Sequence, residues 1–324
     1  MTGKLAVVFG GSGFVGRNVV RELASRGWRV RAAVRRPHLA QYLRPMGAVG
    51  QVQLFQANVR TASSVADALQ GADAVVNLVG ILAEDGKQDF PAVQAEGTRT
   101  IASLAAAQGI TNVVHVSAIG SLASSSSEYA RTKAEGEAAM REHLPSATIL
   151  RPSIIFGPRD SFFNRFADMA RLSPGLPLIG GGKTRFQPVY VDDVADSVCT
   201  ALGDNKTDGR TYELGGPGVY SFKELMQYML KVIGRRRLLV AVPFAVATGM
   251  GNVGGLIGKL PFGSPPLTAD QVELLKSDNI VGISGEDEIG TIEDLGITPQ
   301  TLESILPVYL VRFRKYGQFS PETV

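Results

Sequence analysis

Tyr129 and Lys133 are a pair of residues that could move a proton. Their spacing in the segment Tyr-Ala-Arg-Thr-Lys places both side chains on one face if the segment is helical. A lysine cation beside a phenol lowers the pKa of the phenol, so the tyrosine can act as an acid or a base. The pattern is common by chance, and without a cofactor site an ordinary surface tyrosine and lysine are the better interpretation.

A glycine-rich turn near the amino terminus could hold phosphate groups. It follows the apolar run 5–9 and precedes a helical pattern that carries Val19, Val20 and Leu23. In such a context glycine allows a tight turn, a close approach of the backbone to a pyrophosphate, and close packing of the helix on the sheet. The free amides at the helix start then face the phosphates. A tight turn without ligand is the alternative. The residues expected to bind the dinucleotide are Gly10, Ser12, Gly13, Phe14, Val15 and Gly16.

Arg35 and Arg36 favour NADP(H) over NAD(H). They follow Val34 at the end of the second strand, where an NAD enzyme usually carries an acid for the ribose 2′-hydroxyl. Two cations at that position can instead bind one phosphate, and a solvated arginine loop is the alternative interpretation.

Apolar strand-like runs alternate with helical patterns in the first half of the chain. Continuous apolar runs such as 74–78 suit parallel strands that are covered on both faces, so we expect an α/β fold with a Rossmann-type doubly wound parallel sheet. Beyond residue 151, Pro and Gly separate shorter segments. We therefore expect a dinucleotide-binding domain over 1–151 and a smaller C-terminal α/β lobe over 152–324. The expected strands are 5–9, 30–34, 52–55, 74–78, 113–116 and 148–150.

Composition and charge exclude several classes of protein. Apolar residues make up 44% and charged residues 19% of the chain, which is typical of a folded globular protein. A formal net charge of +3 is too small for nucleic-acid binding, although the basic cluster 235–237 stays unassigned. The lone Cys199 is expected to be a core thiol, and the three scattered histidines indicate no metal site. The amino terminus shows no signal-peptide pattern.

The stretch 238–258 contains no charged residue. Its length requires that a membrane span be considered, but Pro243 and five glycines would weaken an isolated spanning helix. We expect either a buried helix in the core of the lobe or a helix on a partner or bilayer surface, with Lys259 and the cluster 235–237 available for anionic head groups.

The spacing from the glycine turn through Tyr129 and Lys133 resembles the extended and atypical branches of the short-chain dehydrogenase/reductase superfamily, which are related to nucleotide-sugar epimerases. This resemblance implies that the lysine also grips the nicotinamide ribose. It further implies that Asn58 and Val59 flank the adenine, that Val79 and Gly80 line the cofactor, and that Pro152 and Ser153 face the nicotinamide side.

Two positions depart from the pattern of that superfamily. Ser117 is the candidate hydroxyl partner of the tyrosine, but the more typical position falls on Ala118 or Ile119. The asparagine of the helix after the fourth strand is replaced by Gln94. The resemblance therefore implies cofactor binding with an incomplete catalytic set of Tyr129, Lys133 and Ser117.

Within the superfamily, the chain resembles the family of the NAD(P)-binding accessory subunit of respiratory complex I, NADH:ubiquinone oxidoreductase, in its bacterial form. The resemblance is carried by the segments 129–137, 151–157, 187–194 and 292–297. It implies a peripheral subunit on the cytoplasmic side of the inner membrane, with NADPH as a structural cofactor that is not turned over. The implied partners are complex I subunits near the junction of the peripheral and membrane arms, and the membrane surface.

Two other functions remain open from the residues. One is a free-standing NADP-dependent reductase, epimerase or dehydratase that acts on a small molecule, with Tyr129 as acid or base. The other is a regulatory binder that senses the NADPH/NADP ratio, which needs affinity but no catalysis.

Overall fold

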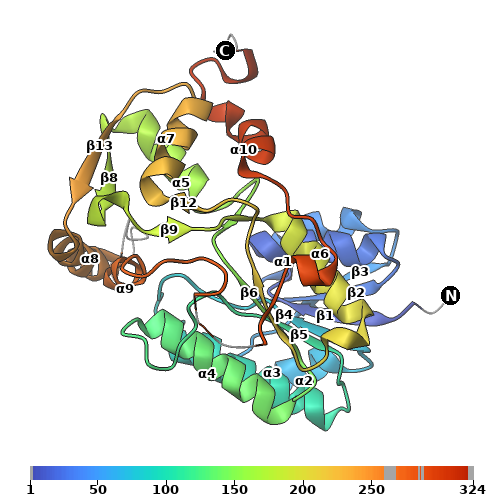
Figure 1. Ribbon diagram of the computed structural model, residues 1–324. Helices are drawn as coiled ribbons and strands as arrows, with labels where there is room; N and C mark the ends of the chain where they lie inside the picture. Colours follow the sequence, from blue (N-terminus) through green and yellow to red (C-terminus); the bar gives the residue numbers. More distant parts are fainter. Residues whose placement is uncertain (1–2, 259–267, 284, 286–287, 320–324) are drawn as a thin grey trace. The chain divides into compact units, whose positions relative to one another are not determined.

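The computed structural model describes residues 3–258, 268–283, 285 and 288–319, and the chain divides into two compact units (Figure 1). Unit 1 comprises residues 1–152, 191–214 and 285–298; unit 2 comprises 153–190, 215–284 and 299–324. The sequence suggested one boundary after residue 151, whereas two later segments belong to unit 1. These segments contribute strands of only four and two residues, which are too short for a periodic pattern to reveal.

Unit 1 contains an eight-stranded parallel sheet, which confirms the predicted Rossmann-type α/β fold. The strand order is β14-β11-β6-β5-β4-β1-β2-β3, so the chain crosses over on both sides of β1. The central strands β1, β4 and β5 are buried at every position and are apolar except at Asn77 and His115, as expected for parallel strands covered on both faces. The strands are β1 (Leu5–Phe9), β2 (Arg29–Val34), β3 (Val52–Gln56), β4 (Ala74–Asn77), β5 (Val113–Val116), β6 (Thr148–Pro152), β11 (Thr211–Leu214) and β14 (Gly290–Thr291).

Helices cover both faces of this sheet (Figure 1). On one face α1 (Phe14–Ser25) packs against α6 (Val191–Gly203). Two ion pairs link them to each other: Arg21 of α1 with Asp192 at 2.7 Å, and Arg26, the C-cap of α1, with Asp196 at 3.1 Å. The helices of the other face are α2 (Ala62–Leu69), α3 (Glu96–Ala107) and α4 (Glu128–His143). Because the strands are parallel, the loops that follow β1, β2, β3, β4 and β5 meet at one edge of the sheet.

Unit 2 is built around an aromatic and aliphatic core that lies between α5, α7 and α10. Ser221 and Glu224 form a capping box at the start of α7, in which each side chain accepts a hydrogen bond from the backbone N–H of the other residue. The helices are α5 (Phe163–Leu172), α7 (Phe222–Val232), α8 (Phe244–Gly258), α9 (Ala269–Leu274) and α10 (Leu302–Leu310). The strands are β7 (Ile155–Phe156), β8 (Gly175–Ile179), β9 (Arg185–Phe186), β10 (Val189–Tyr190), β12 (Tyr220–Ser221) and β13 (Leu238–Val242).

The expectation of one helix over the charge-free stretch is wrong for its first part. Residues 238–242 form β13, which pairs in parallel with β8, and only the residues from Phe244 onward are helical. Pro243 separates the two elements because it lacks the N–H that a strand would donate and suits the start of a helix. Lys259 lies outside the described residues. Among the described helices, none combines the length and the apolar character that crossing a bilayer requires.

Candidate functional site

The glycine turn connects the carboxyl end of β1 to the start of α1. Gly10 has a φ of +80°, and a Cβ there would lie 3.2 Å from the carbonyl of Leu78, beyond the end of β4. A Cβ on Gly16 would lie 2.2 Å from the carbonyl oxygen of Gly10, so no larger residue fits without a backbone shift. Gly13 is the N-cap of α1, and because no side chain caps this helix, its first backbone amides can bind an anion. Half-buried residues at the turn are Ser12, Phe14 and Val15.

Two side chains outside the glycine motif support the turn. Tyr42, on the short 3₁₀ segment Gln41–Met46, donates its hydroxyl proton to the carbonyl oxygen of Ser12 at 2.6 Å. Arg17 of α1 donates to the Tyr42 hydroxyl at 3.1 Å, and its guanidinium lies 4.6 Å from the ring centroid. A cation is thereby held near the start of α1. Sequence reasoning missed this pair because it joins residues 25 positions apart that belong to no shared motif.

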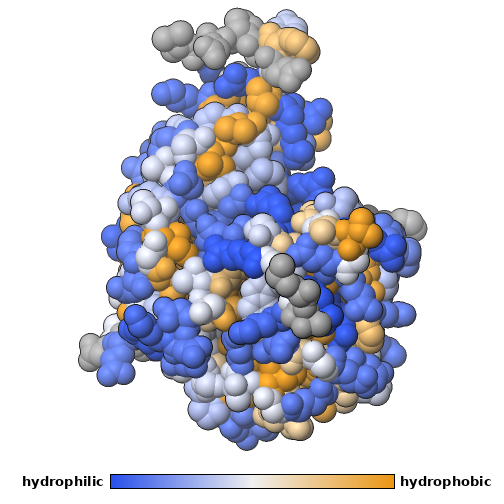
Figure 2. All heavy atoms as spheres, turned by 90° about the vertical axis from the view of Figure 1, so that its right-hand side faces the viewer, coloured by the Kyte–Doolittle hydropathy of each residue, from blue (hydrophilic) through white to orange (hydrophobic). Residues whose placement is uncertain are grey.

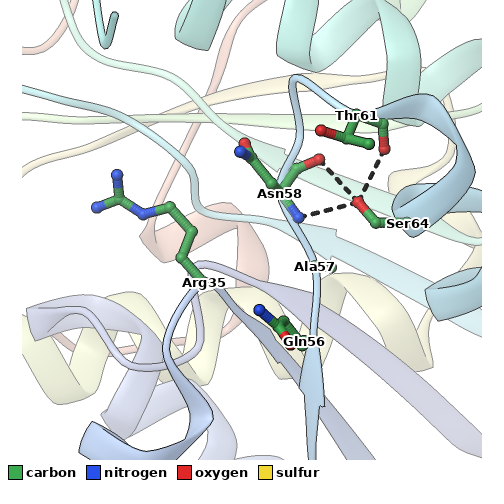
Figure 3. A pocket seen from close by; sticks show the side chains of 6 residues that line it. All are labelled: Arg35, Gln56, Ala57, Asn58, Thr61 and Ser64. Atoms are coloured by element: carbon green, nitrogen blue, oxygen red, sulfur yellow. Dashed lines mark hydrogen bonds between the residues drawn. The ribbon is translucent and has the colours of Figure 1, made fainter. Parts of the chain in front are cut away.

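Arg35 lines a cavity of about 390 Å³ at the carboxyl ends of β2 and β3 (Figure 3). Its side chain and that of Asn58 reach toward the same opening, one from the residue after β2 and the other from the loop after β3. Ser64 shapes the opposite wall, because its hydroxyl accepts from the Asn58 amide at 3.0 Å and donates to the carbonyl of Thr61 at 2.8 Å. Arg36 is also exposed but does not line the cavity. The structure thus brings two of the predicted residues together, Arg35 and Asn58.

Tyr129 and Lys133 lie on α4, whose N-cap Ser127 accepts a hydrogen bond from Ala130. The Lys133 side chain is buried, and its Nζ donates to the carbonyl of Val116 at the end of β5 at 3.3 Å. Burial lowers the pKa of Lys133 to about 8, although the Glu137 carboxylate opposes the shift. Tyr129 is half-buried, and the Phe90 ring meets it edge-on with 5.9 Å between the ring centroids.

Lys133 also lies against the predicted cofactor loop that follows β4. A Cβ built on Gly80 would come within 3.1 Å of Nζ, so a larger side chain there would press on the lysine. The backbone amide of Val79 donates to Asn77 Oδ1 at 3.1 Å, which fixes the beginning of this loop. The glycine turn, Val79, Gly80 and the lysine therefore lie along the carboxyl ends of three adjacent strands, β1, β4 and β5.

Ser117 does not present a free hydroxyl. Its Oγ lies 3.0 Å from Ser121 Oγ, and Ser121 in turn donates to the carbonyl of Ala118 at 2.8 Å. The two hydroxyls therefore form a local hydrogen-bonded pair. The neighbouring positions, Ala118 and Ile119, carry no hydroxyl. The local serine pair was not evident from the sequence.

Gln94 occupies a single π-helical turn, Pro91–Ala95, ahead of α3. Its side chain is buried, and Nε2 donates to the carbonyl of Ile81 at 3.2 Å. Among the described residues no donor reaches its buried Oε1. Gly136 of α4 packs against this turn, because a Cβ there would lie 2.7 Å from the Gln94 carbonyl oxygen. Gln94 thus places a buried amide oxygen at the position where the superfamily pattern has an asparagine.

His115 is a buried, uncharged neighbour of this site. Its Nδ1 lies 3.1 Å from Nδ2 of Asn77, which also donates to Thr98. Since Asn77 Nδ2 is the donor, the ring proton must be on Nε2, which has no hydrogen-bond partner among the described residues. Burial, with the cations of Lys133 and Arg141 adding to it, lowers the pKa of His115 to about 3. The imidazole therefore acts as a neutral packing residue rather than as a base near pH 7.

The remaining predicted site residues are Val59, Pro152 and Ser153. Val59 is buried, and its side chain would be 2.8 Å from a Cβ on Gly97 of α3. Pro152 is the last residue of β6 in unit 1. Ser153 is the first residue of unit 2, where its buried hydroxyl lies 2.7 Å from Oδ1 of Asn279.

A buried ion pair joins α4 to β6 next to the candidate site. Arg151 of β6 donates through NH2 to a carboxylate oxygen of Glu137 at 2.7 Å and through Nε at 3.0 Å to the other. Both side chains are about nine-tenths buried. Glu137 therefore balances two buried cations, Arg151 directly and Lys133 one helical turn away. No pattern in the sequence indicates that Glu137 and Arg151, which are 14 positions apart, form an ion pair.

Two further side-chain expectations concern sulfur and metal chemistry. Cys199 is buried in α6, and burial raises the pKa of its thiol to about 12, so it is a poor nucleophile. In the described part of the chain, no cluster of three or more His, Cys, Asp or Glu side chains could hold a metal ion.

Comparison with known proteins gives two kinds of match. The profile of the NAD dependent epimerase/dehydratase family matches residues 6–215. The mitochondrial NADH dehydrogenase [ubiquinone] 1 alpha subcomplex subunit 9 of Arabidopsis thaliana is 34% identical, over 100% of this chain and 81% of that protein. The protein of the same name from Mus musculus is also 34% identical, over 99% of this chain and 84% of its own length.

A solved structure shows the same fold at lower sequence identity. The dTDP-glucose 4,6-dehydratase of Streptomyces venezuelae, crystallised with NAD, aligns with a TM-score of 0.69 and 21% identity. The alignment covers 95% of this chain and 96% of the dehydratase.

Proposed function

Because this chain belongs to the NAD dependent epimerase/dehydratase family and, within it, to the family of the NADH dehydrogenase 1 alpha subcomplex subunit 9, we propose that it is an NADPH-binding accessory subunit of respiratory complex I. In this role NADPH is a structural cofactor that stabilises the fold and a docking surface. The subunit is peripheral, on the cytoplasmic side of the inner membrane, near the junction of the peripheral and membrane arms. The similarity to complex I subunits along the whole chain supports the assignment.

The state of Ser117 is the observation that favours a structural cofactor over turnover. The nucleotide side of the site has an uncapped helix start, a glycine turn and an arginine-lined cavity. The catalytic side has a serine whose hydroxyl is already hydrogen-bonded to Ser121. Binding alone is useful, since a ligand at about 100 times its dissociation constant adds about 2.7 kcal/mol to the free energy of unfolding.

Isolation of the tagged protein from gently solubilised membranes tests this function. We expect complex I subunits and one NADPH per chain to copurify with it. Mass spectrometry identifies the polypeptides, and acid extraction identifies the nucleotide. A solitary protein whose cofactor exchanges freely would contradict the accessory role.

We assign the preference for NADPH to Arg35. Its exposed guanidinium lines the cavity beside Asn58, and no acid stands at this position to bind a ribose 2′-hydroxyl. A guanidinium can bind a phosphate through two parallel N–H donors, which makes the interaction strong and directional. The 2′-phosphate of NADPH therefore fits this cavity better than the hydroxyl of NADH.

Arg35→Ser should weaken NADPH binding by about 10- to 100-fold, the loss expected for a charged hydrogen bond. NADH affinity should change less than threefold, because NADH has no 2′-phosphate. Titration calorimetry on the purified apo chain measures both values. Arg99→Ser is the control, since Arg99 of α3 forms a surface ion pair with Glu142 of α4 and does not line the cavity. Equal losses for NADPH and NADH would refute the assignment.

The second candidate is a reductase, epimerase or dehydratase, and the Tyr129–Lys133 pair favours it. The lysine pKa of about 8 and its place beside Gly80 suit the activation of a tyrosine. Under this alternative, Tyr129→Phe abolishes turnover but leaves NADPH bound. Under the accessory role, the same variant assembles normally and the wild-type chain is inactive on a panel of carbonyl and nucleotide-sugar substrates.

A further inference from the structure

The segment that follows β2 carries Arg35 and then returns to the glycine turn. We call residues 35–46 the arginine loop; it contains two short 3₁₀ turns, Pro37–Leu39 and Gln41–Met46. Leu43, which is fully buried, anchors the second of these turns in unit 1. Figure 2 views unit 1 from the side of β2 and β3, where the surface is mostly hydrophilic. Water therefore competes with the hydrogen bonds that hold the exposed parts of this loop.

Two hydrogen bonds tie the arginine loop and the strand before it to the glycine turn. At the end of β2, the carbonyl of Ala33 accepts from the amide of Gly10 at 3.3 Å. Farther along the chain, Tyr42 donates its hydroxyl proton to the carbonyl oxygen of Ser12 at 2.6 Å. The residues between these contacts, Arg35 among them, therefore form a loop that is closed on the turn. A loop held at both ends has fewer conformations than one held only by the strand before it.

Arg17 strengthens the contact that Tyr42 makes. One of its terminal nitrogens donates to the Tyr42 hydroxyl at 3.1 Å, and its Nε donates to the carbonyl of Gly13 at 3.3 Å. The guanidinium also lies over the Tyr42 ring, 4.6 Å from the centroid, where the π-electrons attract a cation. The phenol oxygen thus lies between a carbonyl that accepts its proton and a guanidinium that donates to it, so its position is set from both sides.

The Arg35 side chain has no such support of its own. Among the described residues, none forms a hydrogen bond or an ion pair with its exposed guanidinium. Its location relative to the glycine turn therefore depends on the backbone of the arginine loop. This location matters for NADPH, because a pyrophosphate at the turn and a 2′-phosphate at the cavity belong to one molecule. A loop already held at the separation of these two groups loses less conformational freedom when the ligand binds.

We propose that Tyr42 is a positioning residue for NADPH, and that it contributes to the preference for NADPH over NADH by holding Arg35 in place. The inference rests on the proposed function, since it concerns the nucleotide that the accessory subunit would hold. The single proton of the Tyr42 hydroxyl is already donated to Ser12, so this group cannot also donate to a phosphate. Tyr42 therefore acts through the arginine loop. NADH, which has no 2′-phosphate, gains nothing from the same contact.

Tyr42→Phe removes the hydroxyl and keeps the ring, which makes it the direct test. We expect NADPH to bind about three- to tenfold more weakly to this variant, the loss typical of one hydrogen bond, whereas NADH affinity stays within about twofold of wild type. In an Arg35→Ser chain, the same substitution should change NADPH affinity by less than about twofold, because the side chain that Tyr42 positions is gone. Titration calorimetry on the purified full-length apo chain measures all of these affinities.

Amide hydrogen exchange of the apo chain gives a second readout that does not depend on the ligand. Tyr42→Phe should speed exchange over residues 36–46 and leave β1 and β4 as they are in wild type, because only the arginine loop loses a contact. Unchanged exchange over residues 36–46 would show that Tyr42 does not hold the loop and would overturn the inference.

Tyr316→Phe is the matched control, because it removes the hydroxyl of an exposed tyrosine in unit 2. Its affinities for NADPH and NADH should equal those of wild type. Equal losses for the two nucleotides in Tyr42→Phe, or the same loss of NADPH affinity with and without Arg35, would overturn the inference while leaving NADPH binding itself intact. A wild-type chain that binds no NADPH would refute the cofactor part of the proposed function and the inference with it.

Discussion

Glu137→Gln should lower the free energy of unfolding by about 3–5 kcal/mol, the cost typical of breaking a buried ion pair. The substitution preserves the shape of the side chain but leaves the Arg151 cation uncompensated in a site that is about nine-tenths buried. Lys133, one turn away, also loses the carboxylate that raises its pKa, so we expect the pKa of Lys133 to fall further below about 8. Urea denaturation followed by circular dichroism measures the loss.

Glu142→Gln is the matched control for this prediction. Glu142 lies on the same helix and pairs with Arg99 at 2.9 Å, but both of these side chains are largely exposed. An exposed pair contributes about 0–1 kcal/mol. A second variant, Glu137→Leu with Arg151→Met, removes both charges and should be more stable than Glu137→Gln alone. If Glu137→Gln and Glu142→Gln lower the free energy of unfolding by equal amounts, burial does not make the Glu137–Arg151 pair more stabilising than the exposed pair.

Acidification from pH 7 to pH 5 should cost the folded state about 2 kcal/mol through His115 alone. Its pKa in the folded chain is about 3, below the ordinary value of 6.5, so the unfolded chain binds a proton first as the pH falls. The stability associated with the neutral imidazole is therefore complete above about pH 6.5 and is lost progressively toward pH 3. Denaturation curves at several pH values measure the slope.

His115→Asn isolates the contribution of this group. The variant cannot titrate in this range, so it should lose about 2 kcal/mol less than wild type between pH 7 and pH 5. Carboxylates titrate in both proteins and cancel in the comparison. His38→Asn, at an exposed position, should leave the slope of wild type unchanged. If His115→Asn has the wild-type slope, the imidazole already carries a proton in the folded state or is accessible to water.

The sequence indicated the elements that depend on local patterns. The apolar strand runs and the glycine turn could be predicted because each depends only on residues within about ten positions in the sequence. Each of these patterns has a direct physical cause in burial, backbone conformation or capping. The spacing of Tyr129 and Lys133 places both on one face of a helix, and α4 shows that the segment is helical. A phosphate-binding role could be predicted for Arg35 because the carboxyl ends of the strands in a parallel sheet, where ligands bind, lie at one edge.

The tertiary structure decided everything that depends on contacts between distant segments. Only the fold shows that Glu137 meets Arg151 and that Tyr42 supports the glycine turn. It also placed strands of two and four residues in the sheet of unit 1 and divided the charge-free stretch into a strand and a helix. The physical reason is the same in each case. Such contacts form between side chains and backbone groups far apart in sequence, and no periodicity within one segment encodes its partner.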